Sequence, residues 1–303
     1  MVSKVANRAC ALAAALLAAV LVLSCASSGE IETTSPRALT VHRSEHAPRE
    51  RVNPHLRVAT LNIAHGRGDS LNQLLVSRDK TRDNLDAISQ FLQAREIHIA
   101  ALQEADAPSW WSGDFDHAAY LAGSAGFSHW AQASHASLGV GHYGTAVLSQ
   151  LPIGSAMAQD FAPSPPTANK GFTLAEVTWP QDTGAPVTID VVSIHMDFSR
   201  KSVRESQMRE LDQVMHGRRN PLVLMGDFNS ETLADRLVAQ AAQNSRHLHT
   251  VPFAQGEHSS YKDKRLDWII VSGEFEIVDY VTAPEVLSDH RAVIATLALK
   301  PQS

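Results

Sequence analysis

The sequence contains only two cysteines in 303 residues, Cys10 and Cys25, so a disulfide-rich scaffold is excluded. It also contains no dense run of lysine and arginine. Its 26 basic residues are outnumbered by 32 acidic ones, which gives a formal net charge of −6. Broad nucleic-acid binding draws on neutralisation of phosphates by Lys and Arg, so a protein that binds nucleic acid over a wide basic surface is not expected.

The composition is that of a globular chain, with 44% hydrophobic and 19% charged residues. A length of 303 residues allows one large domain or two ordinary ones. No internal repeat and no long low-complexity tract is present. A disordered or fibrous chain is therefore not indicated.

The first residues have the features of a targeting segment. Lys4 and Arg8 form a short basic region ahead of an apolar run of about fifteen residues, 9–23, which is short for a membrane-spanning helix. The run ends at Ser24-Cys25 and is followed by small polar residues. This end resembles the lipobox of bacterial lipoproteins, in which the cysteine is lipidated and becomes the new N-terminus. The alternative is an ordinary signal peptide with a cysteine near its cleavage site.

We therefore predict a signal peptide at 1–24 and an exported lipoprotein of the cell envelope, anchored to the membrane through lipidated Cys25. The mature chain then has no free thiol, which suits an oxidising compartment. Its formal charge becomes about −8, because two of the 26 basic residues leave with the signal and none of the 32 acidic ones does. Residues 25–54 are rich in Ser, Thr and Pro and predict a flexible tether. Residues 55–303 are expected to form a single, monomeric domain.

Strand-like and helix-like stretches alternate along that domain. We expect strands at 56–63, 97–102, 143–149, 172–179, 187–195, 222–225, 266–271, 275–281 and 292–299, and helices at 79–95, 202–216 and 231–242. Both kinds of element are abundant and mixed. The predicted class is therefore α/β or α+β with a sheet at its core.

Four of the expected strands end in polar residues that are poorly suited to a core. These residues are Asn62, Glu104, His195 and, after the fourth strand, Asp227 and Asn229. Open α/β sheets bind ligands beyond the carboxyl ends of their strands. Four such endings with metal or phosphate ligand types predict one convergent site. If the chain stays extended, Asp227 and Asn229 face the same side.

Two later segments add acid and base groups. Asp267 begins a strand and would be costly to bury alone. Asp289 and His290 precede the last strand and, being adjacent, need different partners. Pairing His290 with Asp267 would set the tautomer and basicity of the imidazole, which leaves Asp289 for a metal or a structural hydrogen bond.

In this order, the motifs resemble the endonuclease/exonuclease/phosphatase superfamily, which includes deoxyribonucleases, abasic-site endonucleases, neutral sphingomyelinases and inositol polyphosphate 5-phosphatases. The motifs are Thr60-Leu61-Asn62, Gln103-Glu104, Gly226-Asp227-Phe228-Asn229, Arg265-Leu266-Asp267-Trp268 and Ser288-Asp289-His290. The resemblance spans nearly the whole mature domain. It implies a four-layered sandwich, with two mainly antiparallel sheets packed face to face and helices outside.

The resemblance also implies roles for these residues in phosphoester hydrolysis. Glu104 is the first choice as a ligand for Mg²⁺ or Mn²⁺, with Asn62 and Asp289 completing the metal set. His290, oriented by Asp267, acts as general base or stabilises phosphate charge. The remaining groups are Asp227, which is the rival base, and Asn229 and His195, which donate hydrogen bonds to the phosphate.

Several neighbouring residues keep two interpretations each. His65 and Arg67 either touch substrate or cap a loop, and the role of His142 stays open. Lys170 is expected to be a solvated loop lysine rather than a substrate-binding cation. The pair Trp110 and Trp111 forms either packing or an apolar lip for a lipid or a base.

The substrate follows least directly from the sequence. A membrane-tethered hydrolase meets lipid head groups or small phosphoesters by geometry, so we favour a phosphodiesterase or phosphatase of that kind. The alternatives are an extracytoplasmic non-specific nuclease, which the acidic charge disfavours, and a non-catalytic lipoprotein binding module on the same scaffold. The complete set of motif residues argues against the binding module.

Cys25→Ala tests the predicted anchor. The substitution should release the mature protein from membranes or stall its processing, because the acyl chains would have no attachment site. Membrane fractionation and mass spectrometry of the N-terminus measure both effects. Unchanged membrane partition without any acyl group would contradict the lipoprotein prediction.

Overall fold

The computed structural model describes residues 35–44, 54–137, 142–182, 184–243, 246–252 and 257–301. Its contacts separate Met1–Thr33 from a second unit, Thr34–Ser303, which holds all the described residues. The predicted signal peptide, Cys25 and residues 45–53 of the predicted tether lie outside the described residues. No helix within the described ranges is long and apolar enough to cross a membrane.

Two seven-stranded sheets form the centre of the fold. The strands of the first sheet are, in spatial order, β1 (Arg37–Ala38), β7 (Ile153–Asp160), β8 (Gly171–Trp179), β9 (Val187–His195), β10 (Leu222–Asp227), β12 (Asp267–Ser272) and β11 (Leu248–His249). Those of the second sheet are β13 (Phe275–Thr282), β14 (Val293–Leu299), β3 (Leu56–Asn62), β4 (Ile99–Asp106), β6 (His142–Ser149), β5 (His129–Ser137) and β2 (His42–Arg43). Only β9–β10 and β3–β4 are parallel pairs among the described strands.

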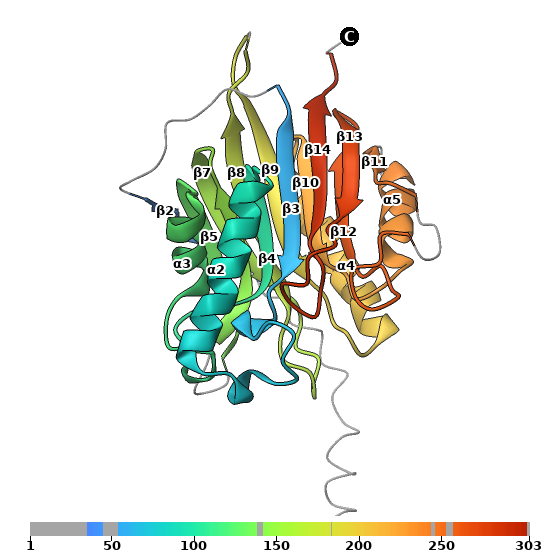
Figure 1. Cartoon of the computed structure of the whole chain (residues 1–303). Coiled ribbons are helices and arrows are strands. Elements are labelled where there is room, and N and C mark those ends of the chain that lie inside the picture. Colours follow the sequence, from blue (N-terminus) through green and yellow to red (C-terminus); the bar gives the residue numbers. More distant parts are fainter. Residues whose placement is uncertain are drawn as a thin grey trace, which may run out of the picture. The chain divides into compact units, whose positions relative to one another are not determined.

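The described helices lie outside the two sheets (Figure 1). They are α2 (Arg78–Ala94), α3 (His117–Ala125), α4 (Lys201–Met215) and α5 (Leu233–Gln243), with short 3₁₀ turns η1 (Ala64–Gly66), η2 (Gln73–Leu75) and η3 (Trp110–Ser112). The apolar residues of α2 and α3 pack on the second sheet, and those of α4 and α5 pack on the first. The predicted four-layered sandwich of two mainly antiparallel sheets is confirmed.

The alternation of side chains along each strand builds these layers. In β10, Val223 and Met225 face the other sheet, whereas Leu222 and Leu224 face the helices. Trp268 in β12 likewise packs on the helix side. Because both faces of each sheet are buried, the central strands are nearly continuous apolar runs in the sequence. The polar residues at their ends are therefore easy to recognise.

The expected elements are found with ends shifted by a few residues, but four α-helices or strands outside the predicted tether were not expected. They are α3, β5, β7 and β11, whose sequences are short or rich in small and polar residues and carry weak periodicity. The tether also differs in part from its expectation. Arg37–Ala38 pairs with β7 and His42–Arg43 pairs with β5, because exposed sheet edges offer these residues main-chain hydrogen bonds.

Gly226, at the end of β10, shows how closely the strands approach one another beside these polar ends. Its φ is +150°, and a Cβ at this position would lie 2.0 Å from the carbonyl oxygen of Ile194 in β9. Gly226→Ala should therefore destabilise the fold by about 1–3 kcal/mol, the usual range for overpacking. Urea unfolding followed by circular dichroism measures the difference. Gly154→Ala is the matched control, because its Cβ would be 4.0 Å from the nearest atom; equal stability of the two variants would contradict the clash.

Candidate active site

The strand register places three of the predicted residues side by side. Asp227 at the end of β10 is opposite His195 on one side and opposite Asp267 on the other. All three side chains are buried. The end of the first sheet therefore carries two carboxylates and an imidazole on three adjacent strands.

His290 joins this row from the connection before β14 and pairs with Asp267, as the sequence predicts. Its Nδ1 donates to Asp267 Oδ2 at 2.7 Å, and its Nε2 lies 3.9 Å from Asp227 Oδ2. Burial alone lowers the pKa of His290, but the charges of Asp267 and Asp227 outweigh it and raise the pKa to about 10. Burial, reinforced by the charge of Asp267, raises the pKa of Asp227 to about 7. The imidazole is therefore strongly favoured in its charged form.

Backbone and hydroxyl groups hold the dyad of Asp267 and His290 in place. The Asp267 amide and the His290 amide each donate to a serine hydroxyl, Ser260 and Ser288 respectively. The ring of Tyr261 lies 4.8 Å from that of His290. Asp267 Oδ1 is buried and accepts no hydrogen bond from the described residues.

Two asparagines fix the Asp227 carboxylate. The Asn62 side chain donates to Asp227 Oδ2 at 3.2 Å, and its own Oδ1 accepts from the Ala64 amide. The Asn229 amide donates to Asp227 Oδ1 at 2.8 Å, while the Asn229 side chain donates to the Met196 carbonyl. Asn229 has φ +50°, so the chain is not extended there as the sequence suggested. A turn closed by the Asp227 side chain competes with the extended conformation.

Glu104 is aimed by a bulge in β4. The pairing of β4 with β6 skips Glu104 between Gln103 and Ala105, and Glu104 has φ +52°. Bulges of this kind re-aim side chains and are frequent next to active sites. Glu104 is less buried than its neighbours in the strand, and its carboxylate borders the same cavity as Asp227 and His290.

Lys170 corrects one expectation. It is buried rather than a solvated loop lysine, because it precedes β8 directly and Gly171 pairs with His195. Its Nζ lies 3.2 Å from His195 Nε2 and 4.0 Å from Glu104 Oε1. Burial and the charge of Lys170 lower the pKa of His195 well below its usual value. His195 is therefore held neutral beside a buried ammonium.

His65 and Arg67, whose roles the sequence left open, both contact predicted metal ligands. His65 Nδ1 donates to Asp106 at 2.8 Å, and its Nε2 lies 3.3 Å from Glu104 Oε2. Arg67 donates to Asp289 Oδ2 at 2.6 Å. Asp106 was not singled out in the sequence; its position two residues after Glu104 was the available signal.

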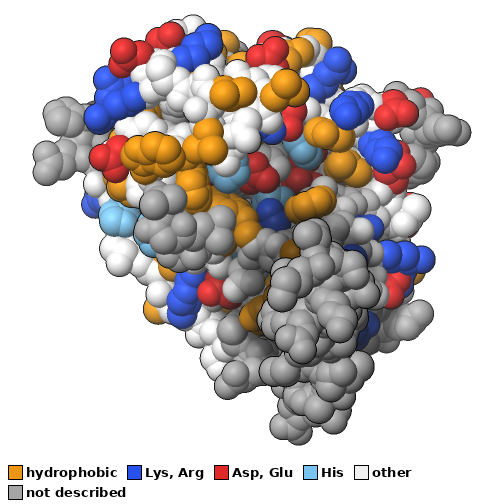
Figure 2. Space-filling model, turned by 90° about the horizontal axis from the view of Figure 1, so that it is seen from below, with side chains coloured by type: hydrophobic (Ala, Val, Ile, Leu, Met, Phe, Trp, Pro, Cys, Tyr) orange, Lys and Arg blue, Asp and Glu red, His pale blue; other side chains and the backbone are white. Residues whose placement is uncertain are grey.

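The groups share one cavity of about 400 Å³ at the end of the sandwich that Figure 2 shows from below. Seven of the eight predicted residues line it: Asn62, Glu104, His195, Asp227, Asn229, Asp289 and His290. Asp267 lies behind His290 instead, as a residue that orients the imidazole. Phe198, Tyr261, Lys264 and Leu266 complete the lining. The site that the sequence predicted is thus assembled in one place.

The donor set of this cavity fits a divalent cation. Glu104, Asp227, Asp289 and Asn62 offer oxygen ligands, which Mg²⁺ and Mn²⁺ prefer. A second possible group overlaps it: one ligand atom each of Asp227, Asp267 and His290 lie within 4.8 Å of one another. In that group the 2.7 Å hydrogen bond of His290 already occupies Asp267 Oδ2.

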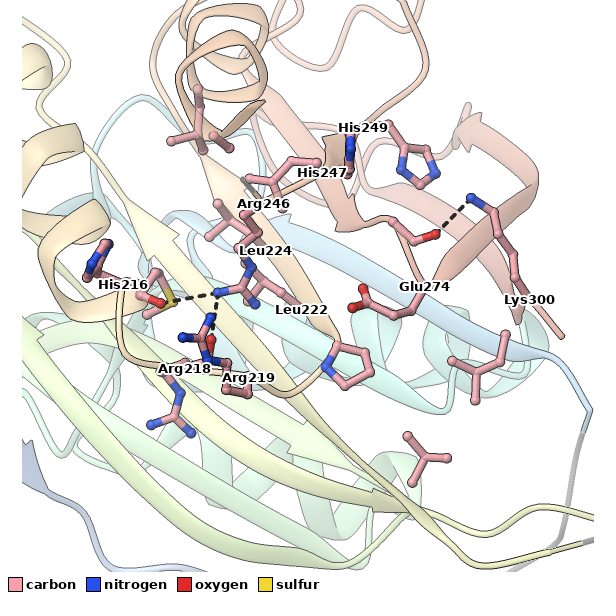
Figure 3. A pocket seen from close by; sticks show the side chains of 18 of the residues that line it. His216, Arg218, Arg219, Leu222, Leu224, Arg246, His247, His249, Glu274 and Lys300 are labelled. Atoms are coloured by element: carbon pink, nitrogen blue, oxygen red, sulfur yellow. Dashed lines mark hydrogen bonds between the residues drawn. The ribbon is translucent and has the colours of Figure 1, made fainter. Parts of the chain in front are cut away.

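A larger hollow of about 1630 Å³ lies elsewhere in the fold (Figure 3). It borders the start of β10, the opposite end of that strand from Asp227. Two of its arginines are paired within the protein: Arg218 with Asp190 and Glu176, and Arg246 with backbone carbonyls to which it donates. The lining of the larger hollow also includes acidic residues and three histidines, but among the described residues a group of three or more acidic or histidine side chains converges only at Asp227, Asp267 and His290. We therefore place the chemistry in the smaller cavity.

Comparison with known proteins agrees with this assembly. The family model described as "Endonuclease/Exonuclease/phosphatase family" matches residues 59–290. The chain belongs to this family. It is accordingly a phosphoester hydrolase, and the match covers every predicted site residue. No curated protein matches the chain significantly.

Solved structures share the fold at low sequence identity. An endonuclease/exonuclease/phosphatase from Beutenbergia cavernae is 19% identical with a TM-score of 0.61, over 81% of this chain and 72% of that one. A mannosyl-6-phosphatase from Bacteroides thetaiotaomicron is 16% identical with a TM-score of 0.56, over 80% of this chain and 100% of that one. A β-toxin from Staphylococcus aureus is 16% identical with a TM-score of 0.55, over 79% and 99%.

Substitution of the dyad tests its role. His290→Ala should lower turnover by at least about a hundredfold, the usual scale for loss of a general acid or base. Asp267→Asn should also lower turnover strongly, because it removes the negative charge that holds the His290 imidazole in place. The double variant should be little worse than His290→Ala, since groups acting as a unit are not additive. Turnover on an active phosphoester measures this, with circular dichroism as folding control. If the two losses multiply, the dyad assignment is wrong.

Proposed function

We propose that this hydrolase depends on a divalent metal, Mg²⁺ or Mn²⁺, and acts outside the cytoplasm on a lipid head group or a small phosphoester. One observation carries the proposal: the bulged Glu104 and the pair of His290 and Asp267 border or flank the same cavity, although Glu104 lies in the second sheet and Asp267 in the first. A carboxylate for a cation beside an oriented imidazole is the combination that phosphoester hydrolysis needs.

Glu104, Asn62 and Asp289 would hold the cation. When bound, it supplies positive charge to a phosphate oxygen and lowers the pKa of a water molecule. His65 and Arg67 orient two of these ligands, Glu104 and Asp289, by contacts of 3.3 and 2.6 Å. Replacing residues that orient metal ligands typically lowers metal affinity or activity by about 10–100-fold.

Donors beside these ligands would bind the phosphate. The imidazole of His195 and the side chain of Asn229 are the donors, with the buried Lys170 ammonium adding positive charge behind His195. His290 Nε2 and Asp227 Oδ2 lie 3.9 Å apart on the cavity wall, so both are placed to exchange a proton with water or with the leaving oxygen. Wild-type turnover in folded His290→Ala would leave Asp227 as the leading base.

A non-specific extracytoplasmic nuclease is the second candidate. The chain's acidic charge of −6 supports it less well, because affinity for nucleic acid depends on many phosphate contacts with Lys and Arg. The mannosyl-6-phosphatase among the similar structures supports a small phosphoester as substrate, through fold alone. A non-catalytic binding module is disfavoured, because no predicted site residue is missing from the assembly.

Chelation of the purified protein should abolish hydrolysis, and Mg²⁺ or Mn²⁺ should restore it, whereas Zn²⁺ should be a poor substitute for an oxygen-rich site. A panel of a bis-aryl phosphate, a phospholipid, plasmid DNA and RNA identifies the substrate class. Full activity after exhaustive chelation would overturn the proposed metal dependence. Preference for DNA or RNA over the other substrates would favour the nuclease.

Glu104→Gln should raise the Mg²⁺ concentration needed for half-maximal activity, and excess Mg²⁺ should partly rescue turnover. Titration of Mn²⁺ by electron paramagnetic resonance measures the loss of metal binding directly. Glu276→Gln on the exposed face of β13 is the matched control and should bind Mn²⁺ like the wild type. Equal Mn²⁺ affinity in Glu104→Gln and wild type would remove Glu104 from the metal set.

A further inference from the structure

Large apolar side chains are exposed around the mouth of the candidate active site. Seven such side chains are exposed among the described residues, and five of them form what we call the apolar rim: Leu71, Leu74, Leu75, Trp110 and Phe198. Leu71 is 95% and Trp110 is 73% exposed. Figure 2 shows apolar side chains gathered beside the acidic and histidine side chains of the hollow.

The rim residues lie on the connections that follow three site strands. Leu71, Leu74 and Leu75 are in the connection after β3, where η2 lies against the η3 turn of Trp110. Phe198 follows β9 and lines the cavity itself while remaining 65% exposed. The cavity is therefore bordered by an exposed aromatic side chain, which a small soluble phosphoester does not require.

A second observation comes from the place where the chain joins the fold. In the first described strand, β1, Arg37 pairs with Ala158 of β7, two residues before the end of that strand at Asp160. Asp160 pairs with Gly171 of β8, and Gly171 pairs with His195 of the candidate site. The chain thus joins the sandwich at the end that carries the active site. Eleven residues lie between Cys25 and Arg37, so the two Cα atoms are at most about 43 Å apart. A lipid anchor at Cys25 would keep this end close to the membrane.

We propose that the apolar rim inserts into a zwitterionic lipid surface, so that the active site takes its phosphoester from lipid head groups. Tryptophan and leucine side chains at such a position gain free energy by leaving water for the interface. Residues 69–80, which carry three rim leucines, have two acidic and two basic side chains and no net charge. Together with the chain's charge of −6, this favours a zwitterionic over an anionic surface. The assignment of a lipid substrate rests on the proposed function, whereas the contact between the apolar rim and the lipid surface does not.

Tryptophan quenching tests the contact without any measurement of activity. The full chain is mixed with phosphatidylcholine vesicles that contain brominated phosphatidylcholine. We expect quenching in the wild type and its loss in Trp110→Phe, because the other tryptophans of the described residues are buried or half-buried. The quenching should persist at 0.5 M NaCl, since it does not depend on charge. Absence of quenching, or equal quenching in Trp110→Phe, would overturn the proposal.

A triple variant, Leu71→Ser with Leu74→Ser and Leu75→Ser, tests the link to substrate. In chains without the acyl groups at Cys25, partition of the triple variant onto phosphatidylcholine vesicles should fall by about tenfold or more, because three leucines no longer leave water. Hydrolysis of phospholipid in the vesicles should fall in parallel, while hydrolysis of a water-soluble bis-aryl phosphate should stay at the wild-type rate. Val278→Ser, an exposed apolar residue in β13, is the matched control and should change neither.

The outcomes separate this inference from the proposed function. If the soluble phosphoester is hydrolysed but the triple variant still partitions and hydrolyses lipid like the wild type, the rim does not contact lipid and the hydrolase assignment stands. If no phosphoester is hydrolysed but Trp110 is quenched, the lipid contact stands and the proposed function fails. A dimer in sedimentation analysis that the triple variant abolishes would identify the rim as a contact between two copies and overturn the proposal.

Discussion

Two carboxylates buried side by side are the constraint on which the rest of the site depends. Asp227 and Asp267 face each other across β10 and β12, where like charges repel and burial removes the water that would screen them. One cation and several hydrogen-bond donors offset this repulsion. His290 supplies the positive charge, and Asn62 together with the Asn229 amide supplies hydrogen bonds. Because these groups come from β3, from the turn after β10 and from the connection before β14, the constraint gathers three distant parts of the chain at one end of the sandwich.

The same logic applies around Glu104, with the signs reversed. The Glu104 carboxylate lies near two groups that carry or can carry positive charge, His65 at 3.3 Å and Lys170 at 4.0 Å, and near the neutral imidazole of His195 at 3.9 Å. Although burial lowers it, the hydrogen bond to Asp106 and the charge of Glu104 raise the pKa of His65. An acidic protein can in this way present a cavity that is locally suited to phosphate, because the charges nearest the site outweigh distant ones in a medium of low dielectric constant.

The sequence predicted the residue types of the site better than their geometry. Polar residues at the ends of apolar strands are visible as a pattern, and the pairing of His290 with Asp267 followed from the cost of burying a lone carboxylate. The bulge at Glu104 and the turn at Asn229 depend on backbone conformations with positive φ. The residue types at those positions did not allow us to predict these conformations. The burial of Lys170 depends on the pairing of β8 with β9, a contact between segments more than twenty residues apart. The sequence did not predict the helix α3 or the strands β5 and β7, because small and polar residues weaken their hydrophobic periodicity.

The site lies between two sheets, so its geometry depends on how firmly the sheets are held together near that end. The space between them is apolar over most of its length, with residues such as Val191 and Val293. Beside the site it becomes polar: the side chain of Gln103 donates to Ser193 Oγ at 3.0 Å, and the Ser193 hydroxyl donates to the Leu102 carbonyl at 2.8 Å. Gln103 precedes Glu104 and Ser193 is two residues before His195, so these bonds link the strand of the proposed metal ligand to the strand of a proposed phosphate-binding residue. Apolar packing tolerates small sliding, whereas buried hydrogen bonds have fixed lengths and directions. These hydrogen bonds between β4 and β9 therefore fix the spacing of the two sheets beside the candidate site.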